Sequence, residues 1–319
     1  MPLVTHATGT GTGGGPAPSG RRHPLTVTYI DPDGTAWAWS NPATGCVVTD
    51  VTGIGSPPAA LADVALSGGG SLAQSYNPAK RSIVIGLHAF DEDAQAGLLD
   101  LVDRLAFALW TERAGLPAPG TLRFARPGGT ARQIEVYCTS GPDQTEAEAT
   151  RDAYQWSTDY ALTFVSALDP LFQDVDPVGP LVFGAPPVSG GVPPMPPVLL
   201  TPSSTLGTST VRNTGNGDAY PVWTITGPGV PTLTNVTTQR AFSLDVALES
   251  DEVITVDTRP TLQSAIDQDG TDRWGDLVKT SPRDLWTLIP GTNVLNLELA
   301  SAGEGSKIEM LYHRRWLRA

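Results

Sequence analysis

The sequence predicts a mainly β protein, with an N-terminal β domain that carries one α-helix and a C-terminal β-sandwich. The 319 residues include 34 glycines and 29 prolines, about a fifth of the chain, which is too many for a mostly helical protein. Apolar and polar residues alternate in many short runs, and only one stretch has clear helical periodicity. Hydrophobic residues make up 40% and charged residues 17%, so the chain has enough apolar material for about two domains.

The N-terminal half begins with a Gly-rich segment and continues as strands. Residues 1–24 contain few large side chains, so we expect a flexible arm that only a neighbouring subunit would order. From Leu25 the pattern has period two, and Asp31–Gly34 supplies the turn of a hairpin. Further strands are predicted at 45–51, 81–90, 121–126, 132–139 and 154–167.

One helix is predicted over residues 92–114. Asp91 is a suitable N-cap, Gly115 and Pro117 end the pattern, and five residues form one apolar stripe at helical spacing: Leu98, Leu101, Val102, Leu105 and Leu109. Leu99 and Trp110 flank this stripe and Phe107 lies nearly opposite its centre, so the apolar surface is wider than one sheet needs. They either belong to the domain core or form a candidate subunit interface.

The C-terminal half follows a proline-rich boundary. Residues 171–204 contain repeated Pro-Pro pairs, which predict a semi-rigid linker between a first β domain at 25–170 and a second domain at 205–319. Short period-two runs follow at 220–226, 230–238, 241–248, 252–258, 285–289, 293–300 and 307–317. Evenly spaced short strands without a strong helix indicate a β-sandwich or a jelly roll.

Charge and composition exclude several classes of protein. The net charge of -13 and the pI near 4.6 disfavour binding to nucleic acid through phosphate neutralisation. No window approaches the length of an apolar membrane span, and the first residues lack the features of a secretory signal, so we expect synthesis in the cytoplasm. Cys46 and Cys138 are then expected to be reduced packing residues.

No catalytic residues and no cofactor are predicted. The G-x-G-x-x-G spacing at Gly9–Gly14 has neither the preceding strand nor the following helix of a dinucleotide site, and no hydrolytic triad or zinc spacing is present. Residues 267–276 form an acidic stretch that we interpret as a hairpin loop. A calcium site is the alternative, with carboxylates from Asp267, Asp269, Asp272 and Asp276.

Two functional alternatives from other classes stay open. Trp223, Trp274 and Trp286, together with Trp316, could stack on sugar rings, as in a carbohydrate-binding module that adheres to host glycans. A cell-wall glycoside hydrolase needs only two carboxylates at a suitable separation, although no pair among the 33 acidic residues stands out.

The order of features from Leu25 to the C-terminus resembles the distal tail proteins of siphovirus-type bacteriophages. The resemblance is carried by the early hairpin and by these ordered segments: 81–85 leading to the helix with Leu98–Leu101, 121–124, 167–172, 213–225, 254–258, 286–293 and 312–317.

The resemblance implies a split-barrel-like N-terminal domain and a galectin-like C-terminal sandwich. It also implies a virion structural protein without enzymatic activity, assembled in the host cytoplasm and located at the tail tip or baseplate. Its copies would form a ring, a hexamer, in which the tail tube protein lies on one side and a hub, tail-associated or fibre protein on the other. The tape-measure protein is a further candidate partner, and DNA would pass only as cargo.

Overall fold

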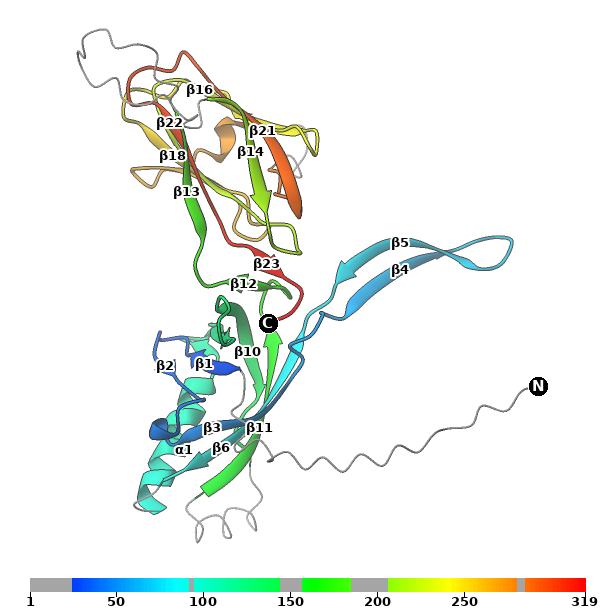
Figure 1. Ribbon diagram of the computed structural model, residues 1–319, viewed down its shortest axis with the longest axis vertical. Helices are drawn as coiled ribbons and strands as arrows, with labels where there is room; N and C mark the ends of the chain where they lie inside the picture. The colour runs from blue at the N-terminus through cyan, green and yellow to red at the C-terminus, as the bar shows by residue number, and fades with distance from the viewer. Residues whose placement is uncertain (1–24, 92–94, 144–156, 185–205, 280–284) are drawn as a thin grey trace, which may run out of the picture.

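The computed structural model describes residues 25–91, 95–143, 157–184, 206–279 and 285–319. These residues form two domains, which Figure 1 shows one above the other. The inner domain comprises residues 25–174 together with 315–319, and the outer domain comprises residues 178–312. Among the described residues, no helix has the length and apolar character required to cross a bilayer.

The inner domain is built on a nine-stranded antiparallel sheet. Seven strands follow the order β2-β1-β9-β10-β11-β6-β3, and β12 joins β10 to β23. Alternating side chains of these strands point into one core, and Tyr29, Trp39 and Phe164 pack together at its centre. The strands are β1 Thr26–Ile30, β2 Ala36–Trp37, β3 Cys46–Thr52, β6 Ser82–Phe90, β9 Gly120–Ala125, β10 Arg132–Ser140, β11 Ser157–Ser166, β12 Phe172–Asp174 and β23 Arg315–Trp316.

Helix α1, Gln95–Leu109, packs on β6 through the predicted stripe, in which Leu98, Leu101 and Leu105 are buried. The helix ends five residues before the predicted limit at 114. The chain reverses there into a small hairpin, β7 Glu112–Arg113 and β8 Leu116–Pro117, whose turn places Ala114 and Gly115 at positive φ. The predicted start at residue 92 lies outside the described residues.

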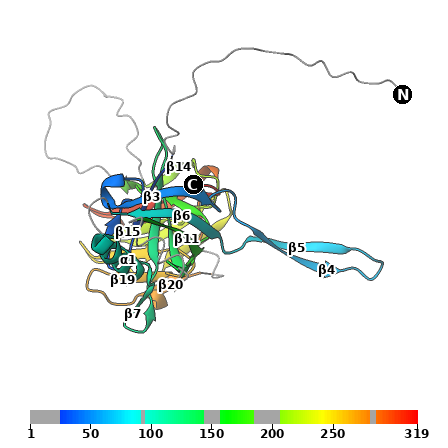
Figure 2. The same ribbon diagram turned by 90° about the horizontal axis from the view of Figure 1, so that it is seen from below.

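A long hairpin, β4 Ala59–Ala65 and β5 Ser71–Pro78, projects from the inner sheet. Figures 1 and 2 show from two directions that it extends away from both domains. We call this hairpin the arm; the name does not refer to the Gly-rich residues 1–24, which lie outside the described residues. Its strands pair only with each other among the described residues, which makes it an appendage of the fold.

The outer domain is a β-sandwich of two five-stranded sheets, in the orders β13-β22-β15-β18-β19 and β14-β21-β16-β17-β20. Trp223 and Trp286 meet edge to face in the core between them. The first sheet contains β13 Val178–Gly184, β15 Val222–Thr226, β18 Val253–Asp257, β19 Ser264–Asp267 and β22 Lys307–Tyr312. The second contains β14 Gly207–Asn213, β16 Val230–Asn235, β17 Arg240–Leu244, β20 Leu277–Val278 and β21 Gly291–Ala300. Short 3-10 turns lie at Pro42–Thr44 and Trp274–Asp276.

The prediction of a linker over residues 171–204 is wrong for the part of this range that the structure describes. Residues Phe172–Asp174 form β12 of the inner sheet, and Val178–Gly184 forms an edge strand of the outer domain. Gly179-Pro180 lies at a register shift of that edge strand, where proline disrupts pairing least. Residues 185–204 lie outside the described residues.

The predicted domain boundary also changes at the C-terminus. Residues 315–316 return to the inner sheet as β23, and Ala319 is buried in the inner core. The outer domain is therefore inserted between two strands of the inner domain.

Candidate assembly surfaces

The arm exposes apolar side chains along its length. Every described side chain of β4 and β5 is exposed, and Leu61, Val64 and Leu72 are 46–62% exposed. Val64 and Leu72 lie directly opposite each other across the hairpin. Asp63 is the only charged residue between 59 and 78. An isolated two-stranded hairpin gains little stability in water, so this composition favours burial against another surface.

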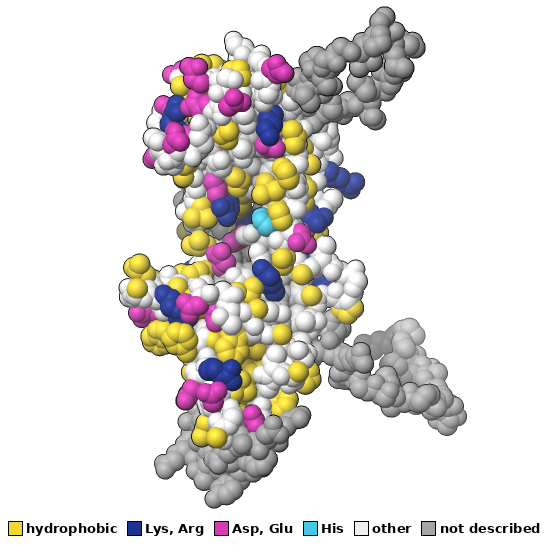
Figure 3. Space-filling model, turned by 90° about the vertical axis from the view of Figure 1, so that its left-hand side faces the viewer, with side chains coloured by type: hydrophobic (Ala, Val, Ile, Leu, Met, Phe, Trp, Pro, Cys, Tyr) yellow, Lys and Arg dark blue, Asp and Glu magenta, His cyan; other side chains and the backbone are white. Residues whose placement is uncertain are grey.

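A second apolar surface surrounds the C-terminal end of α1. Phe107 is 64% exposed and Trp110 is 59% exposed, and Leu116 on β8 is exposed beside them. Leu99, 57% exposed, lies on the same side of the helix. We call these four residues the helix patch. Figure 3 views this side of the molecule and shows hydrophobic side chains gathered over the inner domain.

Arg113 fixes the shape of the helix patch. Its guanidinium carbon lies 4.7 Å from the centre of the Phe107 ring. The same group donates one bifurcated hydrogen bond from Nε, 3.0 Å from each carboxylate oxygen of Asp33, and one of 2.7 Å from Nη2 to the same carboxylate. It donates others to the carbonyls of Trp110 and Glu112. These hydrogen bonds lower the pKa of Asp33 and raise the pKa of Arg113.

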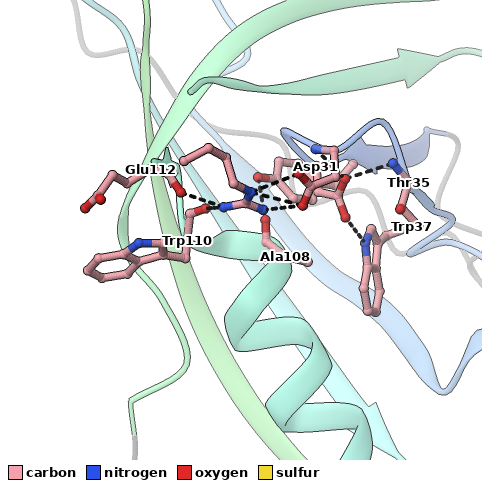
Figure 4. A network of polar contacts seen from close by, with 9 residues as sticks. Asp31, Thr35, Trp37, Ala108, Trp110 and Glu112 are labelled. Atoms are coloured by element: carbon pink, nitrogen blue, oxygen red, sulfur yellow. Dashed lines mark hydrogen bonds and ion pairs between the residues drawn. The ribbon is translucent and has the colours of Figure 1, made fainter. Parts of the chain in front are cut away.

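The turn that presents Asp33 is ordered by Asp31. Its carboxylate accepts hydrogen bonds from the backbone of Asp33 and Thr35, and a third of 3.2 Å from the indole of Trp37. The Tyr29 hydroxyl donates to the Ala108 carbonyl at 3.1 Å and ties β1 to the last helical turn, and burial raises the pKa of Tyr29. Figure 4 shows the Trp110 indole pointing away from this network, which leaves it available for a contact.

The arm and helix α1 lie on different sides of the inner domain. In Figure 1 the arm extends to the right and α1 lies at the left, and Figure 2 shows the same separation from below. Two unlike surfaces at separate places on one chain suit a heterologous contact, in which the arm of one copy meets a different surface of the next.

The two domains meet at a charged contact that excludes much of the solvent. Arg315, 8% exposed, donates hydrogen bonds of 2.7 and 2.6 Å to the two carboxylate oxygens of Asp169 and one of 2.6 Å to the Asp218 carbonyl. Burial by itself would lower the pKa of Arg315, but Asp169 raises it above its usual range. The guanidinium also lies 4.6 Å from the centre of the Tyr220 ring.

A cavity of about 380 Å³ lies beside this contact, between the two domains and the base of the arm. Glu135 and Asp169 both line it. Arg315 binds Asp169 through two hydrogen bonds, so one of these two carboxylates already has a charged partner.

The predicted sugar-stacking role is wrong for two of the three tryptophans. Trp223 and Trp286 have no exposed surface, because both belong to alternating positions that face the sandwich core. Trp274 is partly buried, and the ammonium of Lys279 lies 3.8 Å from its ring centre. Trp316 is covered similarly by Arg132, at 4.0 Å. The carbohydrate-binding alternative therefore loses Trp223 and Trp286.

The acidic stretch at 267–276 forms a hairpin loop, as its first interpretation predicted. Asp267 accepts hydrogen bonds from the backbone of Asp269 and Thr271, Asp272 accepts one from Trp274, and Asp276 binds Arg273. These carboxylates are used in separate local contacts. Among the residues that the structure describes, no group of three or more His, Cys, Asp or Glu side chains could hold a metal ion.

Sequence reasoning missed the arm as a candidate site. Its signal was present in two runs of similar length, 59–65 and 71–78, on either side of the glycines Gly68–Gly70. Their many alanines and serines are weak strand formers, so the pairing was not recognised. The predicted interface residues Leu99, Phe107 and Trp110 are exposed, and their contact with another chain stays a prediction.

No protein-family model and no curated protein sequence matches this chain. Among solved structures, the fold resembles the Dit protein of phage SPP1, described as a paradigm of the hub adsorption apparatus in phages that infect Gram-positive bacteria. The TM-score is 0.61 at 12% identity, over 91% of this chain and 98% of that chain. A chain of the phage P2 baseplate in its activated conformation has TM-scores of 0.47 with calcium and 0.49 with strontium, at 9% and 10% identity and with the same coverage. Because the likeness to SPP1 Dit spans both domains, this chain has the two-domain, mainly β fold of that protein.

Proposed function

We propose that this chain is a structural subunit of a phage or phage-like tail tip, and that its copies join head to tail into a closed ring. The observation that carries the proposal is the presence of two unlike apolar surfaces, the arm and the helix patch, at separate places on the inner domain of a Dit-like fold. The arm of one copy packs on the helix patch of the next. Six copies close the ring, in agreement with the family that the sequence resembles.

The proposed ring joins the tail tube to the distal apparatus. The inner domains contact the tail tube protein, and the outer domains face the hub, tail-associated or fibre protein. The tape-measure protein and the DNA occupy the centre only during assembly and ejection. The high acidic content supports this role, because a negatively charged inner wall repels phosphate and does not retain the DNA.

The test is the mass of the assembly for wild type and two variants, Leu72→Asp in the arm and Trp110→Asp in the helix patch. Both side chains are more than half exposed in the isolated chain, so each variant should fold, whereas a charge in the contact should disrupt the ring. Val236→Asp is the matched control, since Val236 is a 48% exposed residue of the outer domain. It should leave the mass unchanged.

Mixing the two variants tests the head-to-tail contact directly. Trp110→Asp retains an intact arm and Leu72→Asp retains an intact helix patch, so a mixture can form one wild-type contact and should give a dimer. Mass photometry with and without the tail tube protein measures these states. If both variants assemble like wild type, or if the wild-type chain stays monomeric in both conditions, the proposal is wrong.

A further inference from the structure

Arg81 lies where the base of the arm meets the inner-domain segments that lead to the outer domain and return from it. It follows the arm by three residues and precedes β6 directly, and its side chain is buried with 1% exposure. Its Nε donates a hydrogen bond of 2.8 Å to the Pro170 carbonyl, and its Nη2 donates one of 2.7 Å to the Leu317 carbonyl. The guanidinium also lies 4.4 Å from the centre of the Phe172 ring.

The remaining hydrogen bonds of Arg81 hold the other end of the arm. Its Nη1 donates to the carbonyls of Gly53 and Gly55, at 2.8 and 2.5 Å, in the segment that leads into β4. Between these glycines, the Ile54 carbonyl accepts a hydrogen bond of 3.1 Å from the backbone of Ala319. The base of the arm is thus bound both by Arg81 and by the last residues of the chain.

These contacts connect three segments that are distant in sequence. Residues 53–55 enter the arm, Pro170 lies on the path toward the outer domain, and residues 317–319 follow the strand that returns from it. Each segment contributes a backbone carbonyl to one guanidinium. Because a buried cation is stable only when its hydrogen bonds are made, displacement of one segment leaves Arg81 partly unsatisfied and favours movement of the others.

Arg81 stays charged at neutral pH, although burial lowers its pKa to about 10. No carboxylate bonds it in the described residues, and Asp169 acts on it only through its charge. The four carbonyls therefore provide most of the compensation for this cation.

Packing between the arm base and the outer domain is incomplete. The interdomain cavity has Asn77 and Pro78 of the arm base on its wall, together with the outer-domain loop at residues 259–262. The arm base and this loop are therefore separated by open space over part of their facing surfaces. Beside this space, Arg81 and residues 317–319, which we call the returning segment, connect the arm base to the chain that comes back from the outer domain.

We propose that Arg81 is a positioning residue that couples the direction of the arm to the outer domain. Movement of the outer domain displaces the returning segment and Pro170, and Arg81 transmits this displacement to both ends of the arm. In the proposed ring, contacts made by the outer domain would in this way alter the contact between neighbouring subunits. The coupling itself is a property of the single chain and does not depend on ring formation.

The test measures the direction of the arm in Arg81→Met. Spin labels on Ser67→Cys in the arm tip and Asp103→Cys on the exposed side of α1 report their distance distribution, in a background where Cys46 and Cys138 are replaced by alanine. A large excess of unlabelled protein keeps one labelled copy in any assembly. Loss of the guanidinium should broaden the distribution about twofold.

A shortened variant that ends at Trp316 tests the coupling to the outer domain. It removes the Leu317 carbonyl and the Ala319 amide but leaves the Arg81 side chain in place. The arm should broaden to the same extent as in Arg81→Met, and the combined variant should broaden little further, because both changes break one connection. The control is Val27→Ala, which weakens the inner core in β1, a strand separated from β6 by three others in the sheet, and should leave the distribution unchanged.

The outcomes separate coupling from general stability. If Arg81→Met or the shortened variant keeps the wild-type distribution, or if Val27→Ala broadens it equally, the proposal is overturned. If Arg81→Met does not fold, the shortened variant decides alone by the same criterion. The mass of the assembly is measured separately, so the spin-label distances can be interpreted even if no ring forms.

Discussion

The Arg315–Asp169 ion pair, within the inner domain at its boundary with the outer domain, gives a prediction whose magnitude follows from the structure. Arg315→Met removes two hydrogen bonds to Asp169 and one to the Asp218 carbonyl. Breaking a buried pair destabilises a protein by about 3–5 kcal/mol. The Arg315 and Asp169 side chains are 10% and 22% exposed, so solvent reduces the effect and we expect about 3 kcal/mol.

Urea unfolding followed by tryptophan fluorescence measures this loss. Asp169→Asn removes the charge but keeps an oxygen to accept the 3.0 Å hydrogen bond from the Leu171 backbone. The double variant should lose at least about 1 kcal/mol less than the sum of the single variants, because both remove one interaction. Arg104→Met is the matched control. Its ion pair with Asp100 is exposed on α1, so it should cost less than about 0.5 kcal/mol.

Two results would refute this reasoning. The first is additivity of Arg315→Met and Asp169→Asn within error. The second is an equal loss of stability in Arg315→Met and Arg104→Met. Either would mean that the Arg315–Asp169 pair does not stabilise the protein as a coupled buried pair.

Three further predictions concern the core, the thiols and the arm base. Trp286→Ala should destabilise the outer domain by about 3–5 kcal/mol and Trp274→Ala by less than about 1 kcal/mol, measured by urea unfolding, because only Trp286 is fully buried. Neither should change retention on a glycan array. Burial raises the pKa of the Cys46 and Cys138 thiols from 9.0 to about 11. Their contribution to stability is therefore complete below pH 9 and is lost as the pH rises to 11. In the double variant Cys46→Ala/Cys138→Ala, the free energy of unfolding should depend less on pH over this interval. Gly53→Ala should increase amide hydrogen exchange at residues 53–58, because Gly53 has a φ of +79° and an added Cβ would lie 2.0 Å from the Ser82 carbonyl oxygen. Gly34→Ala is the control, since an added Cβ at Gly34 would have no atom within 4 Å.

Local patterns predicted most strands of both domains. The runs at 81–90 and 132–139 became β6 and β10 with boundaries within one residue, because each alternates strongly between core and surface. The run at 285–289 did not become a strand. Its apolar residues are buried, but Leu288 forms only an isolated bridge to Ala219. Alternating apolar residues predict which side chains are buried. Whether the segment forms a strand depends on a partner strand that is distant in the sequence.

The candidate site was less predictable than the fold. Helical spacing identified Phe107 and Trp110 as residues outside the main stripe, and both are exposed. The positions of Arg81 and Arg315 could not be predicted, because their partners lie 26–236 and 97–146 residues away in the sequence. A single arginine in a strand or near a chain end gives no local indication of such contacts.

The insertion of the outer domain between β12 and β23 affects how the protein can be modified. The departing and returning chains lie side by side, and the Asp174 backbone donates a hydrogen bond of 3.0 Å to the Arg314 carbonyl. A terminal deletion that removes the outer domain would therefore also remove β23 and the buried Ala319. Excision between these neighbouring points, closed by a short turn, would preserve both. The same two junctions would allow a different domain to be grafted in place of the sandwich, so that the inner domain serves as a platform for exchangeable modules.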